Sequence, residues 1–252
     1  MPNMRLSNKL KQWRDSDVSI KRWGYHVAKV FWRVLQFVSN PANRSSRIVE
    51  WRFGEQYFQR ASYTSPNRYP ALFDQCKVYL GANRHLKILS YGCSTGEEVF
   101  TLGEYMPDSD IVGADINGWC IRQCNKRRLS RNHSFCLTNS REFKNADNFD
   151  AIFCMAVFQR SENRASPGSE ISIGFKFAQF EREIGMLDAK LRRLGLLFID
   201  HTDFNFEDTV HSSHYRPLEF DGNRIEYKRP LFNRNNRKVS DTQRLHRVFV
   251  KQ

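Results

Sequence analysis

Short apolar runs and longer amphipathic segments alternate between residues 87 and 201. The short runs are typical of buried strands. We expect strands at 87–91, 110–115, 133–138, 149–154 and 196–201. The longer segments repeat apolar residues at three- and four-residue steps, which indicates helices at 96–105, 117–129 and 177–194. This alternation predicts an α/β fold with a Rossmann-like, doubly wound and mostly parallel sheet.

The C-terminal part of the chain carries two further signals. Gly195 follows the apolar stripe of the helix expected at 177–194 and is a natural helix end. Residues 224–232 and 245–250 have strand-like composition and are joined by a polar link. We therefore expect an antiparallel C-terminal hairpin that closes the sheet.

The first 80 residues are predicted to form a helical extension, and residues 81–252 the main domain. Residues 18–38 form one amphipathic helix with basic residues beside its apolar face. Such a helix either binds an anionic membrane surface or packs against the main domain. Asn40-Pro41 ends it, and further helices are expected at 46–60 and 71–80.

Composition narrows the class of protein. The chain has 252 residues, 40% of them hydrophobic, and a formal net charge of +13. This basic excess suits nucleic acid, an anionic membrane or an anionic substrate, although basic enzymes without such a partner are common. None of the six cysteines forms a CxxC pair, so we expect no metal site and a reducing, cytoplasmic location. No apolar run is long enough to span a bilayer.

Residues 88–98 hold the most informative motif, Ile-Leu-Ser-Tyr-Gly-Cys-Ser-Thr-Gly-Glu-Glu. It indicates a strand, a turn with two glycines and the acidic start of a helix. Glycine lets the backbone approach a ligand closely. The next strand ends in Asp115, whose carboxylate could accept hydrogen bonds from a ribose. Ligands of open α/β sheets bind at the carboxyl ends of the strands. The glycine turn and Asp115 together therefore predict a nucleoside-containing cofactor.

These motifs resemble the class I S-adenosylmethionine-dependent methyltransferases, and most closely the chemotaxis-receptor (CheR-type) family. Residues 94–98 are similar to its cofactor turn, Asp115-Ile116 to its ribose-binding step and Asn139 to its adenine-side asparagine. The resemblance covers about residues 60–205 and implies S-adenosylmethionine as the cofactor. The cofactor-binding residues that it implies are Arg68, Gly92, Ser94, Thr95, Gly96, Glu98, Asp115, Ile116, Asn139, Ser140 and Cys154.

Several of these roles have alternatives. Glu98 either accepts from the cofactor ammonium or only stabilises the helix N-terminus. Arg68 pairs with the cofactor carboxylate, orients an anionic acceptor, or is an ordinary surface arginine. His201, with Asp203 nearby in sequence, is either a general base or a solvated histidine. The family has Arg-Asn and a tyrosine after the fourth strand, whereas this chain has Met155-Ala156 and Arg160. Arg68, Arg160 and His201 are therefore the candidate catalytic residues.

These departures put a protein-glutamate acceptor in doubt. The leading hypothesis is an S-adenosylmethionine-dependent methyltransferase that methylates an oxygen of a small-molecule, lipid-linked or saccharide acceptor, which could be anionic. The alternatives are a protein carboxyl methyltransferase of the chemotaxis type, or a basic membrane- or RNA-binding module on a methyltransferase scaffold. No aromatic RNA-binding signature is present, so nucleic acid is not expected as a partner.

Overall fold

The computed structural model describes residues 19–54, 58–59, 64–81, 84–127, 130–160, 170–171 and 174–252. The chain divides into two units, Met1–Ile48 and Val49–Gln252. The boundary expected at residue 80 stays a prediction. Within the described part of the chain, every helix is too short or too polar to cross a bilayer.

The N-terminal segment is helical, as the apolar periodicity predicts. Helix α2 spans Ser19–Ser39 and α3 spans Pro41–Phe53. Asn40 separates them, and its Oδ1 accepts hydrogen bonds from the backbone N–H groups of Ala42 (3.1 Å) and Asn43. Asn40 therefore caps α3, with proline at the first helical position. Helix α3 begins five residues before the expected 46, and part of the remainder, up to residue 60, lies outside the described residues.

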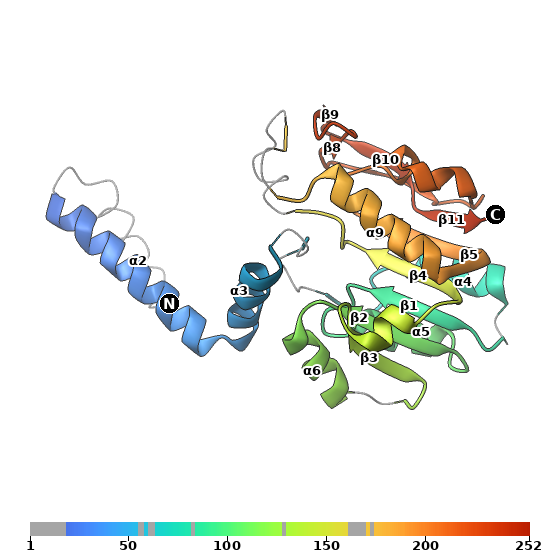
Figure 1. Ribbon diagram of the computed structural model, residues 1–252, viewed down its shortest axis with the longest axis horizontal. Helices are drawn as coiled ribbons and strands as arrows, with labels where there is room; N and C mark the ends of the chain where they lie inside the picture. The colour runs from blue at the N-terminus through green and yellow to red at the C-terminus, as the bar shows by residue number, and fades with distance from the viewer. Residues whose placement is uncertain are drawn as a thin grey trace. The chain divides into compact units, whose positions relative to one another are not determined.

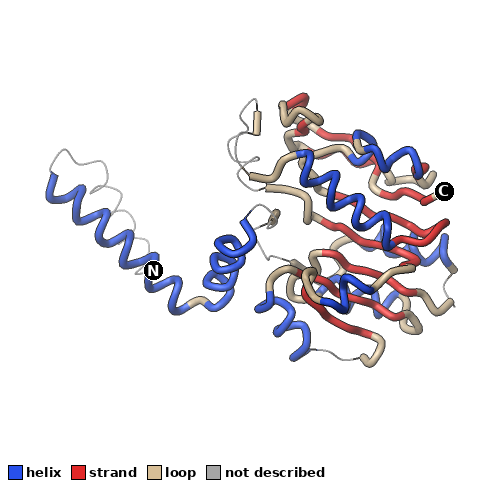
Figure 2. The backbone as a smooth tube through the Cα atoms, viewed as in Figure 1, coloured by secondary structure: helices blue, strands red, loops and turns tan. Residues whose placement is uncertain are grey.

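A seven-stranded sheet forms the centre of the second unit (Figures 1 and 2). Its strands are β1 (Lys87–Tyr91), β2 (Asp110–Asp115), β3 (His133–Leu137), β4 (Phe149–Met155), β5 (Leu191–Asp200), β6 (Tyr215–Pro217) and β11 (Val248–Lys251). Their order is β3-β2-β1-β4-β5-β11-β6. The first five strands in the chain are mutually parallel, whereas β11 runs antiparallel to both β5 and β6. The prediction of a mostly parallel Rossmann-like sheet is confirmed.

Helices cover both faces of this sheet, so its strands are apolar on both sides. The helices are α4 (Pro70–Leu80), α5 (Glu97–Tyr105), α6 (Gly118–Arg127), α7 (Arg141–Asn145) and α9 (Phe177–Lys190). One apolar cluster joins α4, α5 and α6 to the sheet, and a second joins α7 and α9 to its other face. The last two residues of the helix expected at 117–129 lie outside the described residues.

Helix α9 corrects one sequence prediction. It ends at Lys190, not at 194, and Leu191 already begins β5. Leu194 has a positive φ of 60° and is 53% exposed, and Gly195 lies within the strand. Leu191 pairs with Phe149 and Leu196 with Ala151, so the start of β5 bulges. Apolar spacing cannot separate a helix end from a bulged strand that follows without a turn.

The two segments of the expected hairpin do pair antiparallel, through β7 (Arg224–Tyr227) and β10 (Gln243–His246), but this pair forms a sheet of its own and does not close the main one. β8 (Leu231–Phe232) and β9 (Lys238–Ser240) form another antiparallel pair. Of the residues expected in the hairpin, those of β11 join the main sheet, between β5 and β6. The break falls at Arg247, whose buried guanidinium lies 3.3 Å from Asp200 Oδ2. The short strand β6 and the 3₁₀ turns Phe206–Asp208 and Val210–His214 were not predicted.

Candidate functional site

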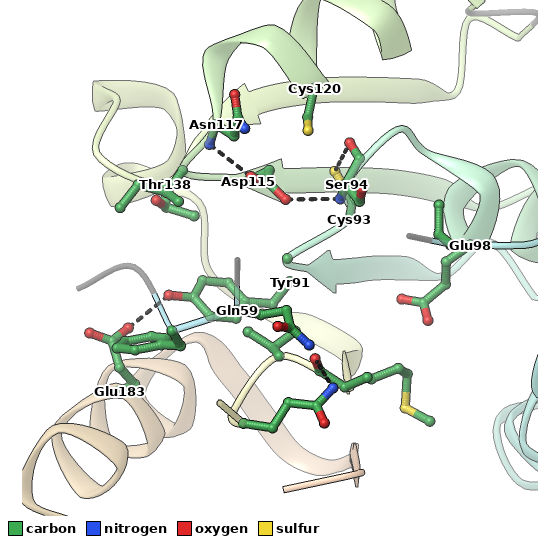
Figure 3. Close-up of a pocket in the computed structure, with 18 of the residues that line it drawn as sticks. Gln59, Tyr91, Cys93, Ser94, Glu98, Asp115, Asn117, Cys120, Thr138 and Glu183 are labelled. Atoms are coloured by element: carbon green, nitrogen blue, oxygen red, sulfur yellow. Dashed lines mark hydrogen bonds between the residues drawn. The ribbon is translucent and has the colours of Figure 1, made fainter. Parts of the chain in front are cut away.

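A cavity of about 560 Å³ opens at the carboxyl ends of β1, β2, β3 and β4 (Figure 3). This is the edge at which open α/β sheets bind ligands. Seven of the residues expected to act line it: Arg68, Gly92, Ser94, Glu98, Asp115, Ile116 and Asn139. The structure therefore brings residues from four separate segments of the chain to one site.

The turn after β1 forms one wall of the cavity and requires glycine. Gly92 has a φ of +74°, and a Cβ at this position would lie 2.5 Å from Val157 Cγ2. Gly96 caps α5 with a φ of +92°. Both angles are in the left-handed region that other residues rarely adopt. A side chain at Gly92 would therefore displace the Val157 loop, which also lines the cavity.

Asp115 ends β2 with its carboxylate held by backbone groups. Its Oδ2 accepts from the Ser94 N–H at 2.9 Å, and its Oδ1 accepts from the Asn117 N–H at 2.7 Å (Figure 3). Burial raises the pKa of Asp115, and these hydrogen bonds oppose the rise. Each oxygen keeps acceptor capacity for a ligand, so the geometry suits a pair of ribose hydroxyls.

Glu98 and Glu97 follow the turn but have different environments. Glu98 lines the cavity, and its Oε1 accepts from Ser90 Oγ at 2.7 Å. Burial raises the pKa of Glu98 to about 7, which Ser90 and Arg68 partly oppose. Glu97 bonds to Thr95 Oγ1 and pairs with Arg127 outside the cavity. Glu98 is therefore the carboxylate available to a ligand ammonium group.

The loop after β3 provides the adenine side of the predicted site. Thr138, Asn139 and Phe143 line the cavity. Ser140 does not, because its Oγ accepts from the Phe143 N–H at 3.2 Å and caps α7. Its expected contact with the cofactor has a structural alternative, namely fixing the loop that carries Asn139.

Five other predicted residues do not line the cavity: Thr95, Gly96, Cys154, Arg160 and His201. Cys154 is buried in β4 within the apolar cluster of α9. Arg160 is also buried, and its backbone N–H donates to Asp203 Oδ2 at 2.8 Å. The structure therefore separates Cys154 and Arg160 from the positions that a ligand in the cavity would contact.

His201 has a different carboxylate neighbour from the one expected. Its Nδ1 lies 3.2 Å from Asp200 Oδ2, whereas Asp203 bonds to the Arg160 backbone. The expected pairing with Asp203 is therefore wrong, because the end of β5 turns that side chain the other way. The His201 ring lies 6.1 Å from the ring of Tyr69, which lines the cavity. His201 thus lies beside a residue of the cavity lining and not in the lining itself, and its general-base role stays a prediction.

Sequence reasoning missed two cavity residues that contact each other. Tyr91 ends β1, and its Oη donates to Glu183 Oε2 of α9 at 2.7 Å (Figure 3). The two residues are 92 positions apart. The one available signal was a tyrosine where the end of a buried strand is usually aliphatic. Within the described residues, no group of three or more His, Cys, Asp or Glu side chains could hold a metal ion.

The residues of the cavity fit S-adenosylmethionine. The cofactor has an amino-acid end, a ribose and an adenine. Glu98 offers a carboxylate to the ammonium, Asp115 one to the ribose, and Asn139 lies on the third side. The glycine turn between them leaves room for close approach of the ligand.

Comparisons with known proteins agree with this fit. Residues 82–177 match the family model of a methyltransferase domain. The prediction of a methyltransferase is thereby confirmed over residues 82–177, less than half of the chain, whereas this match does not test the closer likeness to the chemotaxis-receptor family. No curated protein is significantly similar in sequence.

Several solved structures are similar to parts of this chain, with low sequence identity. TehB from Haemophilus influenzae is 15% identical, with 75% of this chain and 64% of that chain covered and a TM-score of 0.48. The plantazolicin methyltransferase BpumL, in complex with a desmethylPZN analog and SAH, is 18% identical (66% and 55% covered, TM-score 0.38). PKMT2 from Rickettsia typhi is 20% identical (54% and 26%, TM-score 0.39). The chain spans less than two thirds of the length of each of these proteins.

Proposed function

We propose that the protein transfers the methyl group of S-adenosylmethionine to an oxygen of a small-molecule, lipid-linked or saccharide acceptor. The observation that supports this proposal is the single cavity in which Glu98, Asp115 and Asn139 occur together. These residues match, in order, the amino-acid, ribose and adenine parts of the cofactor.

The chain's residues would act by positioning. S-adenosylmethionine supplies an activated methyl group on a sulfonium when it is bound. Glu98 would hold the ammonium and Asp115 the ribose, so both ends of the methyl-bearing segment are fixed. Direct displacement depends on alignment of the acceptor oxygen with the methyl carbon. Two fixed anchors would reduce the entropy that the cofactor loses when it reaches this alignment.

The acceptor side of the cavity favours an anionic or neutral oxygen. Arg68 lies at the cavity with its guanidinium 5.2 Å from the ring of Tyr69. Gln59 and Gln159 add neutral polar groups to the same lining. A guanidinium can orient an anionic oxygen, and such an oxygen needs no general base. This would explain why His201 can lie next to Tyr69 and outside the cavity lining.

Calorimetry and methyl transfer test the proposal in sequence. Wild type should bind S-adenosylhomocysteine in a titration, and Asp115→Asn should weaken binding about tenfold or more, because a ribose acceptor is lost. Tritiated S-adenosylmethionine should then label a small-molecule, lipid or saccharide fraction of a cell extract. Absence of binding by wild type, or unchanged binding by Asp115→Asn, would contradict the proposal.

A chemotaxis-type carboxyl methyltransferase is the second candidate. The turn Ser94–Glu98 supports it, since this segment carries the resemblance to that family. Base-labile label on acidic proteins would favour it over the first proposal. Label confined to small acceptors would exclude it.

We also propose that α2 attaches the protein to an anionic membrane surface. Trp23 is 70% exposed and Phe31 is 63% exposed, while Val27 and Val30 are exposed on the same helix. Helix α2 contains four basic residues and no acidic one. Aromatic and basic side chains together are typical of helices that lie in the membrane interface. This charge pattern favours anionic lipid over a second protein surface.

Vesicle cosedimentation tests this attachment. Wild type should sediment with phosphatidylserine-containing vesicles and not with purely zwitterionic ones. Trp23→Ser with Phe31→Ser should abolish sedimentation. Val78→Ser removes an equally exposed apolar residue from α4 and should change nothing. Equal sedimentation of the helix variant and wild type would show that α2 does not bind the vesicles.

A further inference from the structure

The Tyr91–Glu183 pair is a part of the cavity to which the proposed function gives no role. Tyr91 is only 7% exposed, and its hydroxyl donates to Glu183 Oε2 at 2.7 Å. Both residues line the cavity. Tyr91 thus fixes one carboxylate oxygen of Glu183, and the position of the other follows from it.

The pair lies on the adenine side of the expected cofactor site. Tyr91 stacks on Phe143, with ring centroids 5.9 Å apart and an interplanar angle of 29°. Phe143 belongs to α7, which begins directly after Asn139 and Ser140. Glu98 is bonded instead to Ser90, whose side chain points to the opposite face of β1. Figure 3 shows Glu98 and Glu183 on opposite sides of Asp115.

The second oxygen of Glu183 has no hydrogen-bond partner among the described residues. Its carboxylate also makes no ion pair within that part of the chain. Lys190, seven residues further along α9, does not pair with Glu183. It donates to the carbonyl oxygens of Phe143, Lys144 and Ala146. A carboxylate taken from water without a cation is unfavourable unless a hydrogen-bond donor meets it. Burial accordingly raises the pKa of Glu183.

We propose that Glu183, oriented by Tyr91, accepts a hydrogen bond from the exocyclic amino group of the adenine and so selects adenine over other purines. This inference rests on the proposed function, because it concerns the same cofactor. The adenine ring would lie among the apolar and aromatic groups of this side, which include Ile116, Phe143 and Val157. Its amino group is a donor, which matches the acceptor-only carboxylate.

A cofactor analog altered at this edge of the purine provides the test. In S-inosylhomocysteine a carbonyl oxygen replaces the adenine amino group and N1 carries a proton, so the carboxylate would face an acceptor at the position of the amino group. Wild type should bind S-adenosylhomocysteine at least about tenfold more tightly than the inosine analog in calorimetric titrations. Glu183→Gln should lose most of this preference, since its amide can turn either an oxygen or an NH₂ group to the ligand.

Two further variants separate this role from a structural one. Tyr91→Phe leaves Glu183 in place without its anchor and should reduce the preference by a smaller factor. Glu181→Gln changes another acid of α9 that does not line the cavity, whose Oε1 accepts from the Val210 N–H. Its ligand preference should equal that of wild type. Thermal unfolding of each variant identifies any that fails to fold, and the wild-type preference stands as a test independent of them.

The outcomes distinguish this inference from the proposed function. If wild type binds neither ligand, the proposed function fails. If wild type binds both ligands equally, or Glu183→Gln keeps the wild-type preference, the adenine role is overturned while the methyltransferase proposal stands. The same holds if Glu183→Gln changes only the KM of the methyl acceptor, because Glu183 would then face the acceptor.

Discussion

Replacing Glu98 by Gln removes one negative charge from the cavity and keeps the size of the side chain. The wild-type carboxyl has a pKa of about 7, against 4.5 without the protein environment, because burial disfavours its ionised form. At 1.36 kcal/mol for each pKa unit, ionised Glu98 lowers the free energy of unfolding by about 3 kcal/mol. The group's contribution is complete below pH 4.5 and is lost as pH rises through 7.

Because the ionised carboxylate destabilises the ligand-free fold, Glu98→Gln should have opposite effects on stability and on binding. At pH 8 the ligand-free variant should be more stable than wild type by up to about 3 kcal/mol, and near pH 4 the two should be equal. Binding changes the other way, because the ionised carboxylate would hold the cofactor ammonium. The variant should bind S-adenosylhomocysteine roughly tenfold to a hundredfold more weakly at pH 8.

Urea denaturation and calorimetric titration between pH 5 and pH 8.5 measure both effects. Wild-type affinity should fall as pH decreases below 7, and the affinity of Glu98→Gln should vary less. Glu97→Gln is the matched control, since Glu97 is the preceding residue and pairs with Arg127 outside the cavity. If Glu98→Gln binds as tightly as wild type with the same pH dependence, Glu98 does not hold the ammonium.

Two further substitutions test the backbone around the cavity. Gly92→Ala should abolish cofactor binding and destabilise the fold by about 1–3 kcal/mol, because its Cβ would lie 2.5 Å from Val157 Cγ2. Gly222 has a similar positive φ but open space around it, so Gly222→Ala is the control for backbone strain. If thermal unfolding shows that both variants lose the same stability, backbone strain and not the contact with Val157 explains the loss. Lys190→Met should lower the urea-derived free energy of unfolding by roughly 1–3 kcal/mol, since three carbonyl oxygens lose their donor. Lys126→Met, exposed on α6, should change it little, and equal effects would contradict this role.

The sheet could be predicted from sequence wherever pairing and periodicity agree. Strands β1 and β2 have the predicted bounds because each is a short apolar run between polar turns. The end of α9 could not be predicted, since Leu194 continues the apolar stripe while β5 has already begun at Leu191. The helix ends at Lys190 because Leu191 pairs with β4, a contact that the spacing of apolar residues along the chain does not indicate.

The candidate site divides in the same way. The positions of Gly92, Glu98 and Asp115 at the cavity could be predicted, because each lies in or beside a local turn or strand end. Tyr91 and Glu183 meet only through the packing of α9 on β1, which no local pattern reports. His201 shows the converse error, since its sequence neighbour Asp203 turns away and Asp200 takes its place.

The distribution of charge bears on the partners that remain to be identified. The cavity lining contains three acidic residues, Glu98, Asp115 and Glu183, and three basic ones, Arg68, Lys144 and Lys190. Lys190 is occupied by backbone carbonyls, so the ligand would meet a balanced or slightly acidic site. A cavity of this kind suits a cationic sulfonium but accounts for none of the chain's net charge of +13. The excess therefore lies outside the cavity, and four of the basic residues lie on α2. The proposed attachment of α2 to anionic lipid would use part of this excess, and the vesicle experiment tests that use separately from any role of Arg68 in the cavity.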